Sequence, residues 1–364
     1  MIPAQFPTPP ESQALNIATS QFSALANSHR YVHCIVKLGG AAITRKDELE
    51  TVNDPVLSAT TLHLREAMGL SYTNVSMDWS RRNGSSIVDL VPNSTDQHLG
   101  FQNPFVVVHG AGSYGHFQAS KSGVNKGDLK NPLVKAGFVA TRISVTKLNQ
   151  GVVRSLALEG IPAVGISPFS AGWSTQNKAL KRDNVLEVQR AVDAGFVPVV
   201  HGDAVLDSTL GCTILSGDVL VSRLAQVIKP NFVVFLVSCL DYLDQNFHTN
   251  VPGVFDRSPE QPGATLLREI VVYEDSSWTI VDPPLGIGSN GGAVETAVAA
   301  HDTTGGMSTK IAEAASIAAM GIDVFIVEAG TPHALEALRG KVKNLKSNKS
   351  WTGTLIRNAL GQTS

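Results

Sequence analysis

The sequence predicts an α/β protein with a central, mainly parallel sheet that is flanked by helices on both faces. Short apolar, β-branched segments alternate along the chain with longer segments of helical periodicity, and this alternation is typical of parallel sheets. Two apolar segments, 32–38 and 105–109, end abruptly in glycine-rich loops, as strands do at the ligand-binding edge of open α/β sheets. The 32 glycines in 364 residues suit a loop-rich α/β protein better than a helical bundle.

Each expected element has a local signal. Apolar runs predict strands, and apolar residues three or four positions apart predict helices. Polar, turn-rich residues at 70–103 indicate an insertion or a long surface excursion, and 205–215 has the composition of a hairpin around Ser208–Gly211. The expected strands are 32–38, 105–109, 161–166, 196–203, 232–237 and 322–327, and the expected helices are 55–69, 141–159, 184–194, one starting near Asp218 and one leading to Gly321.

The composition excludes several classes of protein. A net charge of −2 gives no electrostatic case for binding nucleic acid or an anionic membrane. The three cysteines, Cys34, Cys212 and Cys239, are widely spaced and form no CxxC pair. A disulfide framework and a zinc cluster are therefore not expected, which fits a reducing compartment. No apolar run approaches the roughly 18 residues that span a bilayer.

The first 30 residues differ in composition from the rest. They hold several Pro, Ser, Gln and Asn residues but no basic region followed by an apolar core, so they do not resemble a secretion signal. We interpret residues 1–30 as a disordered extension and expect a cytoplasmic location. The remaining 31–364 are long enough to bury a large core as one domain.

The segment Val106–His116, VVVHGAGSYGH, is the most informative motif of the chain. An apolar run that ends in glycines is typical of a buried strand entering a loop. Glycine backbones can approach a phosphate closely and direct N–H groups toward it, and His116 can add a donor. Taken alone, the segment would fit a plain strand-to-helix turn better than a phosphate site.

Two further loops of this kind carry lysines. Lys37 lies in an otherwise apolar strand just before Gly39 and Gly40, where its charge is costly unless it is matched. Lys310 lies in TGGMSTK, which leads into a helical pattern and places the lysine near the first turn. Helix N-termini disfavour cations and favour phosphates, so Lys310 is interpreted as a phosphate ligand.

Two lysines and several glycine loops at the ends of strands predict phosphoryl transfer, which needs positioning and positive charge more than covalent chemistry. The chain has no GxxxxGK[ST] segment and lacks the HRD and DFG signatures, so a P-loop enzyme and a protein kinase are excluded. Residues 117–140 are then expected to form a mobile cover over the acceptor site.

Six motifs occur in a family-specific order between Val32 and Leu355: KLGGAAITRK, VVVHGAGSYGHFQASKSGV, PVVHGD, ILSGD, TGGMSTKI and WTGTLI. In this combination the chain resembles the amino-acid kinase superfamily, and most closely its isopentenyl phosphate kinase branch. The histidine that closes GAGSYGH is the narrowest marker of that branch. The resemblance implies a three-layer fold and transfer of the ATP γ-phosphate to isopentenyl phosphate, which yields isopentenyl diphosphate and ADP in isoprenoid biosynthesis.

The resemblance also implies roles for individual residues. About 31–205 would bind the acceptor and about 206–364 the nucleotide. The family's catalytic residues match Lys37, Lys46, His116, Asp218 and Lys310, with Lys46 stabilising the transition state and Asp218 organising the active-site lysines. The residues implied to bind ATP are Lys37, Gly39, Gly40, Ala41, Gly112, Gly305 and Lys310, and those implied to bind the acceptor are Ala111, Gly115, His116 and Gly202. Mg²⁺ would be held by ATP oxygens and water, without protein metal ligands, and relatives suggest a homodimer.

The acceptor chemistry agrees with this inventory. A phosphate monoester has a second pKa near ~6 and is already an anion at neutral pH, so no general base is required. The isoprenoid tail needs an apolar pocket, for which Phe138, Val139, Ile143 and Phe169 are candidates.

One segment departs from the family pattern. Where the family has TDVxGVF, this chain has Ser238, Cys239 and Leu240, followed by about a dozen inserted residues before Gly253. The segment normally lies beside the nucleotide, so its change bears on ATP binding. Two alternatives therefore stay open: a related kinase of another small phosphate or phosphonate, and a non-catalytic nucleotide or isoprenoid-phosphate sensor on the same fold.

Overall fold

The computed structural model describes residues 29–45, 47–70, 102–238, 252–256, 262–273, 277–283, 306–342 and 350–359, with the backbone alone at 306–310. The chain divides into two compact units, Met1–Tyr31 and Val32–Ser364. All described helices and strands belong to the second unit. The predicted insertion, apart from its first and last residues, and the Cys239–Leu240 replacement fall outside the described residues.

The second unit is built on a mainly parallel sheet, as predicted. Its described strands follow the order β11-β10-β13-β12-β9-β1-β2-β6-β3, and every neighbouring pair from β12 to β3 is parallel. Antiparallel pairs occur only toward the other edge, at β12–β13 and β10–β11. The strands are β1 (Cys34–Leu38), β2 (Phe105–His109), β3 (Ala163–Ile166), β6 (Val197–His201), β9 (Phe232–Val237), β10 (Glu269–Val272), β11 (Trp278–Asp282), β12 (Asp323–Glu328) and β13 (Thr354–Asn358).

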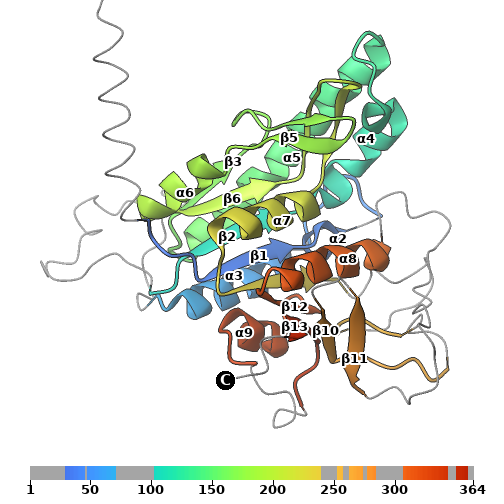
Figure 1. Cartoon of the computed structure of the whole chain (residues 1–364). Helices are drawn as coiled ribbons and strands as arrows, with labels where there is room; N and C mark the ends of the chain where they lie inside the picture. The colour runs from blue at the N-terminus through green and yellow to red at the C-terminus, as the bar shows by residue number, and fades with distance from the viewer. Residues whose placement is uncertain are drawn as a thin grey trace, which may run out of the picture. The chain divides into compact units, whose positions relative to one another are not determined.

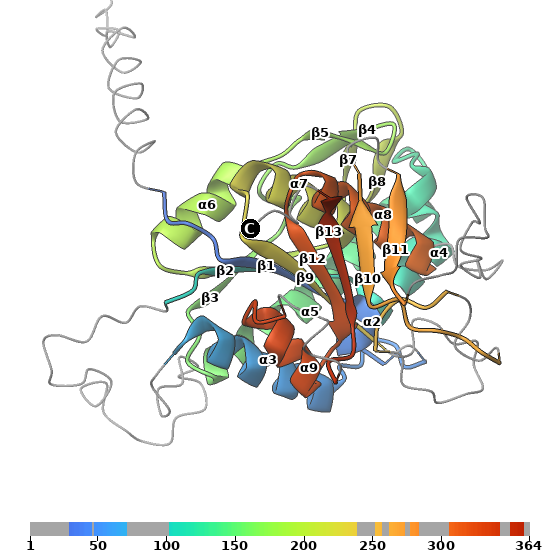
Figure 2. The ribbon, with the colours of Figure 1, turned by 60° about the horizontal axis from the view of Figure 1, so that its bottom comes forward.

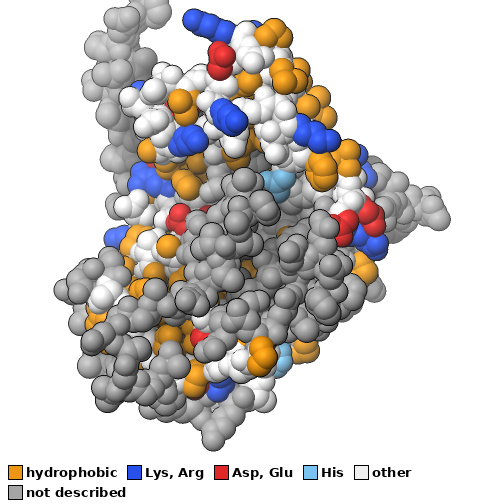
Figure 3. Space-filling model, turned by 90° about the vertical axis from the view of Figure 1, so that its right-hand side faces the viewer, with side chains coloured by type: hydrophobic (Ala, Val, Ile, Leu, Met, Phe, Trp, Pro, Cys, Tyr) orange, Lys and Arg blue, Asp and Glu red, His pale blue; other side chains and the backbone are white. Residues whose placement is uncertain are grey.

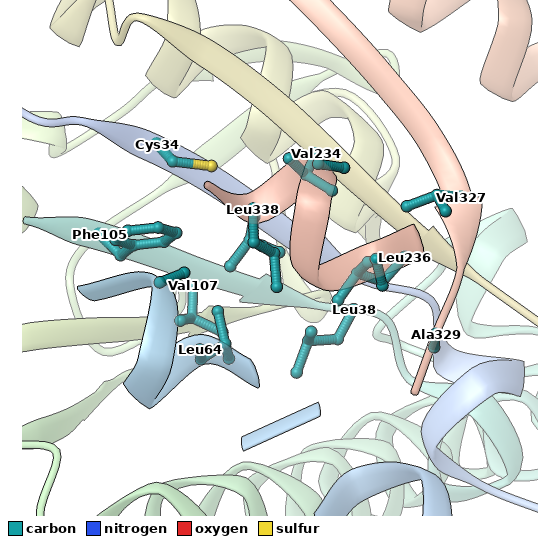
Figure 4. Packing of buried hydrophobic residues seen from close by; sticks show 14 of the residues in the cluster. Cys34, Leu38, Leu64, Phe105, Val107, Val234, Leu236, Val327, Ala329 and Leu338 are labelled. Atoms are coloured by element: carbon teal, nitrogen blue, oxygen red, sulfur yellow. The ribbon is translucent and has the colours of Figure 1, made fainter. Parts of the chain in front are cut away.

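Helices cover both faces of this sheet, which confirms the three-layer prediction (Figures 1 and 2). One layer holds α3 (Asp54–Met68), α5 (Pro132–Leu158) and α9 (Pro332–Leu338), and the other holds α6 (Val185–Asp193), α7 (Gly217–Ile228) and α8 (Gly306–Ala319). Alternate residues of one strand point to opposite layers. Val36 and Leu38 of β1 pack in the first core cluster, whereas Ile35 packs in the second. Figure 4 shows part of the first cluster, in which the helix residues Leu64 and Leu338 pack with the strand residues Val107 and Leu236.

The central strands are buried throughout, because both of their faces are covered. Every residue of β1, β2, β6 and β9 is buried, which explains why their sequences are continuous apolar runs and not alternating ones. Lys37 is the charged exception in β1. It lies on the same side of the strand as Ile35 and therefore faces the layer of α7 and α8.

A second, smaller sheet has the strand order β5-β4-β7-β8. It contains β4 (Ser174–Gln176), β5 (Ala179–Arg182), β7 (Asp203–Asp207) and β8 (Gly211–Leu215). The predicted hairpin is confirmed, because β7 and β8 pair antiparallel around Ser208–Leu210. The Asp207 carboxylate stabilises the turn between β4 and β5 and the turn between β7 and β8. It accepts hydrogen bonds from the backbone N–H of Lys178 (2.8 Å) in the first turn and of Thr209 (2.8 Å) in the second.

The start of α5 and the structure of the segment before it differ from the prediction. The long helix α5 starts at Pro132, nine residues before the predicted position 141, because Asn131 caps it by accepting a hydrogen bond from Leu133 N at 2.9 Å. Residues 117–140, expected as a cover, therefore form most of α4 (His116–Ser122), the short helical turn η4 (Val124–Lys126) and the first part of α5. Their predicted mobility stays a prediction.

Among the described helices none is both long enough and apolar enough to cross a membrane. On the face shown in Figure 3, the described lysine and arginine side chains are scattered among apolar and acidic ones and do not form one stripe.

Candidate active site

The candidate site lies where β1, β2 and β6 end, and the loops after these strands are joined by backbone hydrogen bonds. Gly110 N–H donates to the Leu38 carbonyl (3.0 Å), and Gly202 N–H donates to the His109 carbonyl (3.0 Å). Gly39 N–H donates to the Leu236 carbonyl of β9 (2.8 Å). The glycine loops predicted to bind phosphate are therefore brought to one edge of the sheet, where ligands of open α/β sheets bind.

The first two loops approach so closely that only glycine fits. A Cβ atom added to Gly40 would lie 2.3 Å from Gly112 N, and one added to Gly112 would lie 2.2 Å from the hydroxyl oxygen of Thr44. Gly112 also has φ +53°, a conformation that favours glycine. These glycines are explained by contact between the loops, before any ligand is considered.

Lys37 and Asp218 form an ion pair at this edge. Lys37 is 5% exposed, and the Asp218 carboxylate offsets the cost of burying its ammonium. Ser216 caps α7 by accepting a hydrogen bond from Val219 N (3.3 Å), and this cap places Asp218 in the first turn of the helix. A Cβ on Gly217 would lie 3.5 Å from Lys37 Cε, so the lysine packs against the start of α7.

Glu313 of α8 is a further charged residue near this pair, and sequence reasoning missed it. Burial raises the pKa of the Glu313 carboxyl, the negative charge of Asp218 raises it further, and the positive charge of Lys37 lowers it. Glu313 lies three positions after Lys310, a spacing that brings side chains to one helix face. That spacing was the signal available in the sequence.

His116, Ala111 and Gly115 come together in the loop after β2. His116 is exposed at the start of α4, and Ala111 is half-buried. Gly115 is buried, and a Cβ there would lie 2.7 Å from Val145 Cγ1 of α5. Close packing against α5 is therefore enough to explain the glycine at this position.

A buried histidine supports each of two loops. His109 and His201 occupy matching positions of β2 and β6, and their rings stack with centroids 5.6 Å apart. Each Nδ1–H donates to the carbonyl of the following glycine (2.9 Å), and Asn149 Nδ2 lies 3.1 Å from His109 Nε2. Burial lowers the pKa of His109 to about 3. In each repeated His-Gly pair, the uncharged histidine therefore stabilises the backbone of the loop that follows its strand.

Two of the four residues predicted for the apolar tail pocket lie together. The rings of Phe138 and Phe169 are 5.6 Å apart, and the Arg142 guanidinium lies 4.2 Å from the Phe169 ring centroid. Val139 is 54% exposed and Ile143 65% exposed. They lie on another side of α5, because successive helical residues are rotated by about 100°. The structure therefore gives Val139 and Ile143 no place beside Phe138.

Arg142 also connects α5 to the loop after β6. Its Nε donates to the buried Asp203 carboxylate (3.2 Å), which also accepts hydrogen bonds from Ser167 Oγ (2.8 Å) and Phe169 N (3.2 Å). Asp203 directly follows Gly202, so this network fixes the loop that Gly202 belongs to.

Other predicted residues fall outside the description. Lys46, Gly305 and Cys239 are not described, and the Lys310 side chain is not either. The described backbone of α8 spans Gly306–Ala319, so Lys310 lies near the start of the described part of this helix. No group of three or more His, Cys, Asp or Glu side chains that could hold a metal occurs among the described residues.

Comparison with known proteins identifies similar sequences and folds. The model of the amino acid kinase family matches residues 33–328. The isopentenyl phosphate kinase of Arabidopsis thaliana is 53% identical over 334 residues, which cover 90% of this chain and 96% of that protein. The isopentenyl phosphate kinase of Methanothermobacter thermautotrophicus is 31% identical over 316 residues, or 84% and 95% of the two chains.

Solved structures agree with the sequence comparison. A crystal structure of an isopentenyl phosphate kinase superposes with a TM-score of 0.60 at 26% identity, over 89% of this chain and 99% of that one. A Thermoplasma acidophilum isopentenyl phosphate kinase in a product complex gives a TM-score of 0.58 at 21% identity, over 90% and 100% of the two chains. The second likeness concerns the fold alone.

Proposed function

Because the chain belongs to the amino acid kinase family and, within it, to the isopentenyl phosphate kinases, we propose that it transfers the γ-phosphoryl group of ATP to isopentenyl phosphate. The products are isopentenyl diphosphate and ADP. The observation that carries this function is the backbone contact of two glycine loops at the ends of β1 and β2, beside the buried Lys37–Asp218 ion pair. This end of the sheet suits a reaction in which the attacking and leaving oxygens lie in line with the transferred phosphoryl group.

The reaction brings two anions together, and the site residues address this obstacle. The Lys37 ammonium faces the phosphates from β1, and Asp218 orients it from the start of α7. Positive charge that is fixed before the reaction stabilises charge on the transferring phosphoryl group without reorganisation. His116 donates to the acceptor phosphate from the start of α4. By resemblance to the family, Lys46 and Lys310 supply further positive charge around the phosphates.

The backbone donors divide into two groups. The N–H groups of Gly39 and Gly202 are used in hydrogen bonds to the carbonyls of Leu236 and His109, so these two glycines shape the loops. Gly40 and Ala41, the first residues of the short helix α2 (Gly40–Ile43), and Gly112 direct N–H groups at phosphate oxygens. Ala111 and Gly115 belong to the acceptor side, and Gly305 to the nucleotide side.

Further properties belong to the same proposal. About 31–205 binds the acceptor and about 206–364 binds the nucleotide. Mg²⁺ travels with ATP and neutralises charge on its phosphates when bound. The chain acts in the cytoplasm. It forms a homodimer, and size-exclusion chromatography with light scattering tests this oligomeric state directly.

Competing acceptors test the function. We expect Mg²⁺-ATP to be consumed with isopentenyl phosphate or dimethylallyl phosphate, at a kcat/KM far above that with fosfomycin or acetylglutamate. A preference for fosfomycin would establish the alternative kinase. Binding of ATP and isopentenyl phosphate by folded protein without turnover of any acceptor would establish a sensor.

A further inference from the structure

Thr44 occupies an unusual position between the two glycine loops. It follows α2 directly, in extended conformation (φ −131°, ψ 159°), and forms an isolated antiparallel bridge with Val52. It is 1% exposed. Neither its type nor its place in the sequence motif indicated a role at the site.

The Thr44 hydroxyl bonds to both loops at once. Its O–H donates to the Gly40 carbonyl at 2.8 Å, and its oxygen accepts a hydrogen bond from Ser113 N–H at 3.0 Å. Ser113 is buried and belongs to the turn η3 (Gly112–Tyr114), shortly before His116. A single hydroxyl group therefore serves as donor to the loop after β1 and acceptor from the loop after β2.

The surrounding packing leaves no room for another group at this point. The Thr44 hydroxyl oxygen lies 2.8 Å from the Gly40 carbonyl oxygen and 3.0 Å from Ser113 N. A methyl group needs about 3.5–4.0 Å from neighbouring heavy atoms. Replacing the hydroxyl by methyl would break both bonds and push the loops apart.

We propose that Thr44 is a positioning residue that sets the spacing between the loop after β1, which contains Gly40, and the loop after β2, which contains Ser113 and His116. This inference rests on the proposed function, in which Gly40 contacts the phosphates of ATP and His116 contacts the acceptor phosphate. Its consequence is specific: the hydroxyl matters for the approach of the two phosphates and much less for the binding of either substrate alone.

The test compares Thr44→Val and Thr44→Ser with the wild-type enzyme. Thr61→Val is the matched control, because Thr61 is also a buried threonine whose hydroxyl donates to a backbone carbonyl, that of Ser58 at 3.0 Å within α3. We measure kcat for isopentenyl diphosphate formation. We also measure the Kd of ADP and of isopentenyl phosphate separately by calorimetry, and the thermal stability of each variant.

For Thr44→Val we expect kcat to fall about 10- to 100-fold, because small misplacements of reacting groups have effects of this size. Each single-ligand Kd should change by less than about threefold, and Thr44→Ser should restore kcat. Thr61→Val should lower stability without changing kcat per folded molecule.

Three results would overturn the proposal: a folded Thr44→Val enzyme with wild-type kcat, equal losses in Thr44→Val and Thr44→Ser, or losses confined to the Kd of one ligand. If Thr44→Val does not fold, Thr44→Ala takes its place in the test. If neither variant folds, Thr44 is required for folding and the proposed positioning role is overturned. A wild-type enzyme that forms no isopentenyl diphosphate would instead overturn the proposed function itself.

Discussion

Two partly buried ion pairs lie near the same edge of the sheet, and their surroundings differ. In the Lys37–Asp218 pair the cation is the more buried partner, with side chains 6% and 20% exposed, and it lies beside the glycine loops. In the Arg142–Asp203 pair the carboxylate is fully buried and accepts further hydrogen bonds from Ser167 and the Phe169 backbone. The Asp203 carboxylate of the second pair accepts hydrogen bonds from Arg142, Ser167 and the Phe169 backbone, whereas the Lys37 ammonium of the first pair lies beside loops whose close approach requires glycine. We infer that the first pair serves the reaction and the second serves the scaffold.

The largest effect is expected for Lys37→Met, which removes the charge of the first pair and keeps the volume. We expect kcat to fall about 10²- to 10³-fold, the usual loss when one preorganised electrostatic group is removed. Lys37→Arg should not restore activity, since a planar guanidinium does not replace a compact ammonium. Steady-state kinetics check this prediction, and a Lys37→Met enzyme with wild-type kcat would remove Lys37 from the site.

Asp218→Asn should lower kcat less than Lys37→Met does, because it leaves the ammonium in place and only loosens its orientation. If the pair acts as one unit, the double variant should lose little more than Lys37→Met alone. A double-mutant cycle on kcat measures this coupling. Strictly additive losses would mean that the two residues act separately.

Arg142→Met tests the scaffold pair, and its effect should appear in stability. It leaves the Asp203 carboxylate buried without its cation, which costs about 3–5 kcal/mol of unfolding free energy. Urea denaturation measures the change. Arg190→Met, which breaks the exposed pair with Glu187 (3.2 Å), is the matched control and should cost less than about 1 kcal/mol. Equal losses in both variants would contradict a scaffold role.

Glu313 should make stability depend on pH. Its pKa is raised in the folded protein, so the folded state binds the proton more tightly than the unfolded state. Stability from this group is therefore fully present below the unfolded pKa and is lost as pH rises through the folded pKa. Compared with Glu313→Gln, the wild-type protein should lose Tm as the pH rises above the ordinary carboxyl pKa of 4.5. A Tm difference that does not change with pH above that value would show that the carboxyl is not perturbed.

The smallest effects are expected on the exposed side of α5. Val139→Asn and Ile143→Asn change well-exposed side chains, so stability should stay within about 0.5 kcal/mol and the KM for isopentenyl phosphate should not change. Phe169→Ala, which removes the ring that packs against Phe138, should raise that KM. Equal changes in all three variants would place the tail pocket elsewhere.

The sequence predicted most of the sheet because its central strands are buried on both faces and appear as continuous apolar runs. The glycine loops could be predicted as well, because their glycines end these apolar runs abruptly. The start of α5 was missed although Asn131 and Pro132 form a standard cap and first position. That signal was local and available, and the apolar pattern further along the helix outweighed it.

The interactions that build the site could not be read from one sequence. Lys37 and Asp218 are 181 positions apart, and Arg142 and Asp203 are 61 apart. No periodicity connects such residues, so Asp218 was found only through the family resemblance. Thr44 was missed because its significance depends on which loop lies opposite it, and this is decided by tertiary packing. Glu313 had only its spacing from Lys310 as a signal, and its interaction with Asp218 also depends on tertiary packing.

Phosphorus NMR of the running reaction tests the central claim most directly. With Mg²⁺-ATP and isopentenyl phosphate, the wild-type enzyme should convert the monophosphate signal into the two coupled signals of a diphosphate while ADP accumulates, and Lys37→Met should leave the monophosphate signal almost unchanged. Release of ADP and free phosphate without a new diphosphate, or equal product formation by both enzymes, would contradict the account.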